Sequence, residues 1–239
     1  MNTLYSKLMI SPGVTAFVGA GGKSTAMETV ALELFQEGHS VAVSTTTHIF
    51  PPSTPLFGAP RNAPSPEEIH FLSEQSRLCV IGNEMDENGK LTGISSAVVS
   101  GLTNVFEYVL IEADGSKRLP CKVPAAHEPV IPDTAGRIVG VIGMSALYQP
   151  LSSACFRFSL AEAEFGLLSE EPITPELLAH IVVSEKGLQK GVDSRPFTLL
   201  LNQQELFPKE TRKTAALCHQ AGIKQVVVAS LAKQIWMIL

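Results

Sequence analysis

Short apolar runs alternate along the chain with longer stretches of helical periodicity. Val14 to Val18 is an apolar run with β-branched residues that ends in a cluster of glycines. From Lys23 to Glu37 apolar residues recur at intervals of three and four, which predicts a helix that Gly38 ends. Ser40 to Ser44 predicts the next strand. The chain therefore opens as strand, glycine turn, helix and strand.

The same alternation continues toward the C-terminus. Further strands are predicted at Leu78 to Ile81, Tyr108 to Glu112, Arg137 to Ile142, Thr198 to Leu201 and Gln225 to Ala229. Further helices are predicted from Ser65, at Ser95 to Leu102, from Thr174 to Glu185 and at Lys209 to Gln220. Strands that alternate with helices favour an α/β fold with a mostly parallel sheet and helices on both faces.

Two proline-rich segments interrupt this pattern. Pro51 to Pro66 contains six prolines and predicts a surface loop, because proline excludes a regular helix or central strand. Gly115 to Pro132 contains four prolines and many polar groups, and it predicts an ordered functional loop. No repeat or linker divides the sequence, so we expect a single nucleotide-binding domain over residues 1–239.

Composition narrows the classes of partner and compartment. The net charge is −5 and the 18 lysines and arginines are scattered, which argues against binding nucleic acid. No window approaches 18 uninterrupted apolar residues and the N-terminus lacks the core of a signal peptide, so we expect no membrane partner. The four cysteines form no Cys-x-x-Cys pair. Reduced thiols and a cytoplasmic location are the expectation.

The loop Gly19-Ala20-Gly21-Gly22-Lys23-Ser24-Thr25 lies at the first strand-to-helix junction. Its glycines allow backbone N–H groups to surround an anion, and the helix N-terminus adds partial positive charge. Lys23 would neutralise the outer phosphates, and the Ser24 hydroxyl would ligate Mg²⁺. We therefore predict that residues 19–25 bind the phosphates of ATP or GTP in a P-loop NTPase-like fold.

The loop is a compact variant, because Phe17 stands where the eight-residue signature needs its first glycine. Gly19 and Gly22 are spaced as in the peptidoglycan-precursor ligases. A dinucleotide-binding turn is the competing interpretation, but its third glycine would fall at Ser24. The second strand also ends in hydroxyl residues, where that fold needs an acid for the ribose. A further alternative is a loop that binds an anionic cofactor.

An apolar strand ends in two carboxylates, Glu112 and Asp114. Acids at such a strand end orient Mg²⁺ or position the attacking group, so both are predicted metal ligands and, with Lys23, catalytic residues. The turn that follows contains Lys117 and Arg118, which suit a phosphate or an acidic substrate. A solvated strand end is the alternative interpretation.

Two further groups are candidates for substrate contact. The hydroxyls of Thr46 and Thr47 could complete a magnesium shell or contact the terminal phosphate, or simply close a strand. His127 and Glu128 lie in the proline-rich segment and could relay a proton or bind a metal. A purely structural role in the loop is an equally weighted alternative for these two residues.

Base recognition is the remaining signal. The strand before Asn202 ends in Asn-x-x-acid, which partly matches the Asn-Lys-x-Asp motif that reads guanine in GTPases. Gln203 replaces the lysine and Glu205 the aspartate. Asn202 and Glu205 are therefore predicted nucleotide contacts that favour guanine over adenine, with a chance polar turn as the alternative and ATP or GTP left open.

Four blocks together resemble the YqeC family. They are Gly-Ala-Gly-Gly-Lys-Ser-Thr at 19–25, Thr-Thr-Thr-His at 45–48, Glu-Ala-Asp-Gly-Ser at 112–116 and the stretch with His-Glu-Pro from Pro124 to Pro132. That family is described as accessory proteins of selenium-dependent molybdenum hydroxylases. The resemblance implies a role in maturation, with a molybdenum hydroxylase or its cofactor as partner.

Two functions fit these observations. The first is a Mg²⁺-dependent NTPase or phosphotransferase, in which the protein positions and neutralises the phosphates. The second is a nucleotide-gated maturation chaperone or binding module with little catalysis of its own. Nucleoside triphosphate is the expected ligand of both.

Overall fold

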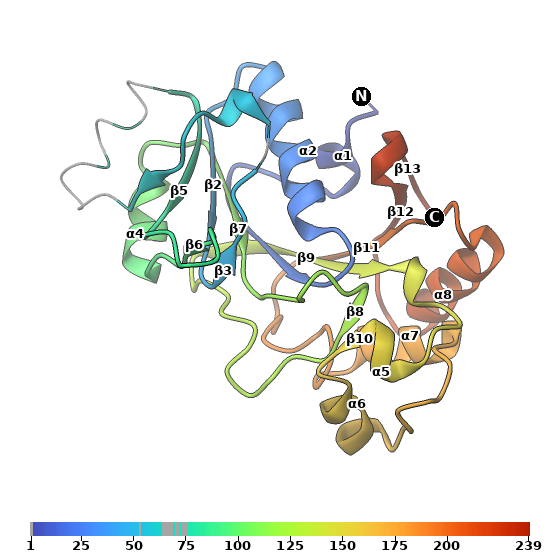
Figure 1. Cartoon of the computed structure of the whole chain (residues 1–239). Coiled ribbons are helices and arrows are strands. Elements are labelled where there is room, and N and C mark those ends of the chain that lie inside the picture. Colours follow the sequence, from blue (N-terminus) through green and yellow to red (C-terminus); the bar gives the residue numbers. More distant parts are fainter. Residues whose placement is uncertain (1, 53, 64–68, 70–71, 73–75) are drawn as a thin grey trace. The chain divides into compact units, whose positions relative to one another are not determined.

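The computed structural model describes residues 2–52, 54–63, 69, 72 and 76–239. The chain divides into two compact units (Figure 1). The first comprises Met1–Phe17, Ser24–Gly115 and Val130–Arg137, and the second comprises Val18–Lys23, Ser116–Pro129 and Ile138–Leu239. The glycine turn therefore belongs to the second unit, and the predicted helix that follows belongs mainly to the first.

Parallel strands form the centre of the first unit. Their order is β1 (Gly13–Gly19), β7 (Tyr108–Glu112), β2 (Val41–Thr45), β5 (Leu78–Gly82) and β4 (Arg61–Asn62). All four neighbouring pairs are parallel, and Glu112 is in register with Phe17 on one side and Thr45 on the other. The apolar residues of β5 and β7 are buried, as runs that pack on both faces of a parallel sheet should be.

Helix α2 (Lys23–Gln36) follows the glycine turn. Its buried residues, Met27, Val30 and Leu34 among them, lie on one face, as the sequence spacing predicts. Both backbone N–H groups at the start of α1 (Leu4–Lys7) donate to the Glu33 carboxylate, which fixes this short helix to α2. The unit also contains η1 (Pro55–Phe57), α4 (Ser96–Leu102) and an antiparallel pair, β3 (His48–Ile49) with β6 (Leu91–Thr92).

The second unit contributes four neighbouring strands to the nine-stranded sheet. The strand order is β9 (Ala135–Gly143), β11 (Phe197–Asn202), β12 (Val226–Ser230) and β13 (Ile235–Ile238), of which only the last joins antiparallel. Helices α7 (Pro175–Val183) and α8 (Pro208–Gln220) pack against each other. A separate parallel pair joins β8 (Cys121–Lys122) to β10 (Cys155–Phe156). The remaining elements are η2 (Met144–Ala146), α5 (Leu151–Ala154), α6 (Phe158–Phe165) and η3 (Leu231–Lys233).

The structure confirms the α/β class with mostly parallel strands and the strand–glycine turn–helix order of a P-loop domain. The short elements that were not predicted are α1, β3, β4, β6, β8, β10, η1, η2, α5 and η3, because elements this brief carry no periodic signal. Helix α6 and strand β13 were not predicted either. The helix predicted from Ser65 lies outside the described residues, and a single domain stays a prediction. None of the described helices is long and apolar enough to cross a membrane.

Candidate functional site

The glycine turn has a backbone that side chains would not permit. Gly19, Gly21 and Gly22 all have positive φ, at 95°, 84° and 132°. A Cβ on Gly21 would lie 2.2 Å from the Gly143 nitrogen, where β9 ends. These positions therefore need glycine both for conformation and for the close approach of two backbone segments.

The turn leaves backbone donors available. In the part of the chain that the structure describes, the N–H groups of Gly21 and Gly22 donate to no protein acceptor. Ala20 differs, because its N–H donates to Val141 O over 2.9 Å and is occupied by β9. Lys23 is 3% exposed, and its ammonium donates to Gly19 O over 2.6 Å. The positive charge of Lys23 is therefore held against the loop itself.

Asn202, the last residue of β11, fixes the turn from the side. Its Nδ2 donates to Gly21 O over 2.9 Å, and its Oδ1 accepts from Leu231 N over 3.1 Å. One buried amide thus connects the glycine turn, β11 and the start of η3. The sequence predicts a nucleotide contact at Asn202, and the structure adds this role in holding the loop.

In the first unit, the start of α2 meets the end of β7. The Ser24 hydroxyl donates to Glu112 Oε2 over 2.8 Å. The backbone at Glu112 is held by the Thr45 hydroxyl, which donates to Glu112 O over 2.8 Å. Asp114 is buried at 2% exposure shortly after this strand. A hydroxyl and a carboxylate at hydrogen-bonding distance are the oxygen donors that suit a hard divalent cation.

The other predicted hydroxyls make contacts within the first unit. Thr46 Oγ1 donates to Val130 O over 2.6 Å, and Thr47 Oγ1 lies 3.3 Å from Thr45 Oγ1, which also accepts from the Thr47 N–H over 2.9 Å. Thr25 is exposed on the first turn of α2. These contacts give the Thr45–Thr47 segment a structural role in the first unit, and its predicted contact with substrate stays a prediction.

A buried carboxylate oxygen lies near the end of β11. Glu205 Oε2 is inaccessible to solvent and accepts no hydrogen bond among the described residues. At the end of the neighbouring strand β12, the Ser230 hydroxyl is buried and unsatisfied in the same way. Buried polar groups without a partner are costly and rare, and a ligand that supplies donors would explain them. Gln203 points elsewhere, because its Oε1 accepts from the Ser145 hydroxyl over 2.7 Å.

The predicted substrate residues of the second unit separate into two kinds. Lys117, Arg118 and His127 are exposed, and the two cations have positive φ of 49° and 63°. Glu128 is buried instead, and its Oε2 accepts from Lys122 Nζ and Arg157 Nε, both over 3.1 Å. The structure therefore places Glu128 inside an ionic network of the protein.

That network contains two cations that the sequence analysis missed. Lys122 is 1% exposed and Arg157 is partly exposed. Burial alone would raise the pKa of Glu128, but hydrogen bonds from Arg157 and Ala125 together with Lys122 hold it below its ordinary value. The sequence offered no spacing signal, because Lys122 and Arg157 are brought together by the β8–β10 pair.

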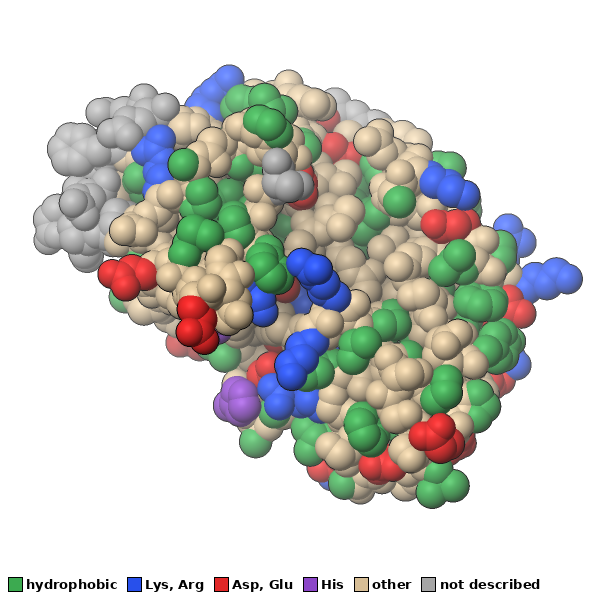
Figure 2. Space-filling model, in the orientation of Figure 1, with side chains coloured by type: hydrophobic (Ala, Val, Ile, Leu, Met, Phe, Trp, Pro, Cys, Tyr) green, Lys and Arg blue, Asp and Glu red, His purple; other side chains and the backbone are tan. Residues whose placement is uncertain are grey.

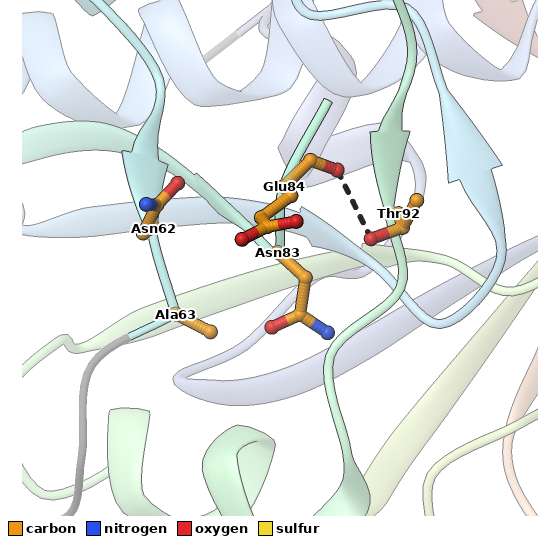
Figure 3. A pocket seen from close by; sticks show the side chains of 5 residues that line it. All are labelled: Asn62, Ala63, Asn83, Glu84 and Thr92. Carbon is orange, nitrogen blue, oxygen red and sulfur yellow. Dashed lines mark hydrogen bonds between the residues drawn. The ribbon is translucent and has the colours of Figure 1, made fainter. Parts of the chain in front are cut away.

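The first unit also contains a polar pocket of about 420 Å³ (Figure 3). It is lined by Asn62, Ala63, Asn83, Glu84 and Thr92, none of which the sequence analysis selected. Asn62 ends β4 and Asn83 follows β5, so the pocket lies at the carboxyl ends of two parallel strands. The Thr92 hydroxyl donates to Glu84 O across its wall.

Comparisons with known proteins agree with the sequence resemblance. The family model described as "YqeC protein" matches residues 15–159. A protein of Escherichia coli (strain K12), "Uncharacterized protein YqeC", is 32% identical over 186 residues, which cover 76% of this chain and 72% of that protein.

Two solved structures show a more distant likeness. The cell division protein FtsY of Thermotoga maritima has a TM-score of 0.41 and 15% identity, over 99% of this chain and 71% of that one. The signal recognition particle receptor FtsY of Elizabethkingia anophelis has a TM-score of 0.37 and 13% identity, over 93% of this chain and 62% of that one. By the family match and the identity to its relative, this chain belongs to the YqeC family.

Proposed function

We propose that this protein is a Mg²⁺-dependent nucleoside-triphosphate-binding protein that hydrolyses the nucleotide or transfers its terminal phosphoryl group. The observation that carries the proposal is the glycine turn between β1 and α2, whose Gly21 and Gly22 N–H groups have no acceptor among the described residues. Successive backbone donors at a helix N-terminus form an anion site, and phosphate is the anion that this arrangement favours.

Lys23 supplies the positive side-chain charge of the site. Its ammonium group donates to Gly19 O, so a phosphate would replace a neutral acceptor by an anionic one. Hydrogen bonds between charged partners are roughly twice as strong as neutral ones, which makes the exchange favourable. In catalysis the same ammonium would stabilise charge that develops on the transferred group.

The Ser24–Glu112 pair fits a magnesium ion by the chemistry of its donors. Mg²⁺ prefers oxygen ligands and is held by one or two carboxylates together with substrate phosphates. When bound it would neutralise phosphate charge. Ser24 follows Lys23 directly in the chain, and Asp114 follows Glu112 by two positions. We therefore propose that Glu112 and Asp114 bind the metal or position the attacking group.

The buried Glu205 oxygen supports guanine as the base. Guanine presents two hydrogen-bond donors on one edge, the N1–H group and the 2-amino group. Adenine has no 2-amino group, and its N1 is a hydrogen-bond acceptor. A carboxylate oxygen that lacks a donor in the protein would be satisfied by guanine and left unsatisfied by adenine. We therefore propose GTP as the preferred nucleotide.

The biological setting follows from the family resemblance. We propose that nucleotide binding or turnover serves maturation of a selenium-dependent molybdenum hydroxylase or its cofactor, in the cytoplasm. Four free, buried cysteines support a reducing compartment. Copurification of such a hydroxylase with the protein in the presence of a non-hydrolysable GTP analogue, and not in its absence, would test the partner.

The function itself is tested by calorimetric titration with non-hydrolysable GTP and ATP analogues, with and without Mg²⁺. We expect Mg²⁺-dependent binding, which the Lys23→Ala substitution should abolish. Lys224→Ala removes a lysine charge from the loop before β12, and this control variant should bind the nucleotide normally. Undiminished affinity in Lys23→Ala, with an unchanged melting temperature, would remove the phosphate-loop assignment. Turnover assays on the same proteins then separate an enzyme from a nucleotide-gated binding module.

A further inference from the structure

The β8–β10 pair of the second unit carries an unusual arrangement of charge. In this pair, whose two strands Figure 1 labels, Cys121 is in register with Cys155 and Lys122 with Phe156. Side chains alternate along a strand, so the two buried cysteines share one face and Lys122 and Phe156 share the other. The second face therefore carries a cation and an aromatic ring.

Three cations approach that ring. Lys117 Nζ lies 5.4 Å, Lys122 Nζ 5.7 Å and Arg157 Cζ 4.8 Å from the centroid of Phe156. Figure 2 shows Lys and Arg side chains gathered on the visible face in the region where Figure 1 places β8 and β10. Like charges repel, so a fold that holds three of them at one ring must offset the repulsion.

Glu128 accepts hydrogen bonds from two of these cations. Its Oε2 accepts from Lys122, from Arg157 and from the Ala125 N–H over 3.2 Å, so one negative charge faces two positive ones at a single oxygen. Lys190 adds a fourth cation, because its ammonium donates to the carbonyls of Ala125 and Ala126 in the same turn. The named groups together hold four positive charges and one negative charge.

Arg157 is prepared for an anion. Its Nε donates to Glu128, and its Cζ lies over the ring of Phe156. Among the described residues the terminal nitrogens donate to no acceptor, so they can make a bidentate contact. The side chain is 29% exposed, so solvent and a ligand can reach it. Arg157 also occupies the N-cap of α6 with a positive φ of 63°, and the first turn of that helix has no acid and no side-chain cap. The partial positive charge of the helix end adds to the same place.

We propose that Lys117 and Arg157, with Lys122 and Phe156 beneath them, form a second anion site for the phosphate group of a small substrate or partner. This site is distinct from the glycine turn and does not depend on nucleotide binding. A phosphate carries about two negative charges, which suit the two contact residues Lys117 and Arg157, and its oxygens suit the planar fork of Arg157. The buried Lys122–Glu128 pair is the support, and Arg157 and Lys117 are the contacts.

The test uses the full chain with Lys23→Ala, so that phosphate cannot bind at the glycine turn. Inorganic phosphate is titrated by calorimetry into this protein and into versions that also carry Arg157→Gln, Lys117→Gln or Lys186→Gln. We expect binding in the Lys23→Ala protein, weakened at least tenfold by Arg157→Gln and measurably by Lys117→Gln. Lys186 pairs with Glu164 on the surface of the same unit, so Lys186→Gln is the matched control and should bind normally.

Three results would overturn the proposal: no phosphate binding in the Lys23→Ala protein, equal binding in all versions, or tighter binding of succinate than of phosphate. Melting temperatures identify a variant that fails to fold. If Arg157→Gln does not fold, the Lys117→Gln variant still decides the test, because Lys117 is exposed. The result does not depend on whether the glycine turn binds nucleotide, because every protein compared carries Lys23→Ala.

Discussion

The Ser24 hydroxyl donates to Glu112 Oε2 over 2.8 Å, between residues 88 positions apart in the sequence. The contact joins the first turn of α2 to the last residue of β7. Each partner is ordinary alone, but together they present the hydroxyl and carboxylate oxygens that a magnesium ion bound to a nucleotide would use.

Removing either oxygen should weaken Mg²⁺-dependent binding specifically. We expect Ser24→Ala and Glu112→Gln each to reduce nucleotide affinity about tenfold or more with Mg²⁺ present, because a contact with a charged group is worth about 1.5–3 kcal/mol. Without Mg²⁺ the same variants should bind almost as the unchanged protein does. Thr29→Ala, which removes a hydroxyl one turn further along α2, is the control for calorimetry. Equal losses with and without Mg²⁺ would assign the pair a structural role.

Gly21 should be the least replaceable residue of the turn. An added Cβ would lie 2.2 Å from Gly143 N and 2.9 Å from Pro120 O, at a φ of 84°. We expect Gly21→Ala to lower the free energy of unfolding by about 2 kcal/mol or more and to abolish nucleotide binding. Gly136→Ala is the matched control, since its Cβ would meet no atom within 4 Å. Denaturant unfolding of both proteins makes the comparison, and similar stabilities would contradict it.

The choice of base should depend on the carboxylate of Glu205. We expect Glu205→Gln to weaken GTP binding roughly tenfold to hundredfold, because the amide no longer offers two acceptor oxygens to guanine. Affinity for ATP should change little. XTP should gain, since its 2-oxo group can accept from the new amide. Glu185→Gln, on an exposed position of the same unit, is the control. Competition titrations measure the affinities of the variants for the three nucleotides. An equal loss of affinity for GTP and ATP in Glu205→Gln would argue against base recognition by Glu205.

Acid should destabilise the second unit through Glu128. Burial raises the pKa of this carboxyl, but Arg157, Lys122 and the Ala125 N–H outweigh burial and bring the pKa below 4.5. A carboxyl whose pKa is lower when folded contributes stability that is complete above its unfolded pKa. That contribution is lost as the pH falls through the folded value. The loss should therefore develop below about pH 4.5.

The variant Glu128→Gln isolates this effect. At neutral pH we expect it to cost about 3–5 kcal/mol, because it breaks a buried ion pair by removing the negative charge that faces Lys122. Its stability should also depend less on pH between 6 and 3 than that of the unchanged protein. Glu176→Gln breaks an exposed pair with Lys213 and should change little, since solvent screens such pairs. Unfolding curves are measured across this pH range for Glu128→Gln and the unchanged protein. If the free energy of unfolding depends on pH equally in both, Glu128 is not the group responsible.

Much of the central architecture could be predicted from local pattern. The strand before the glycines, helix α2 and the strand that ends at Glu112 all appear within a residue or so of their predicted bounds. Larger differences occur at α7, which ends at Val183 where the pattern extended to Glu185, and at β9, which begins at Ala135 where the pattern began at Arg137. The short strand β8 lies inside the segment predicted as a loop, because two paired residues leave no periodic trace.

The sequence by itself determined where the glycine turn and the helix after it lie, since the freedom of glycine to adopt positive φ and the helical periodicity after Lys23 are local properties of the chain. Only the tertiary structure decided which distant groups meet there. It joined Asn202 to Gly21, left Glu205 Oε2 buried without a donor and enclosed Glu128 between Lys122 and Arg157. Such contacts depend on which strands pair, and strand pairing is set by packing of the whole unit, which no local pattern contains.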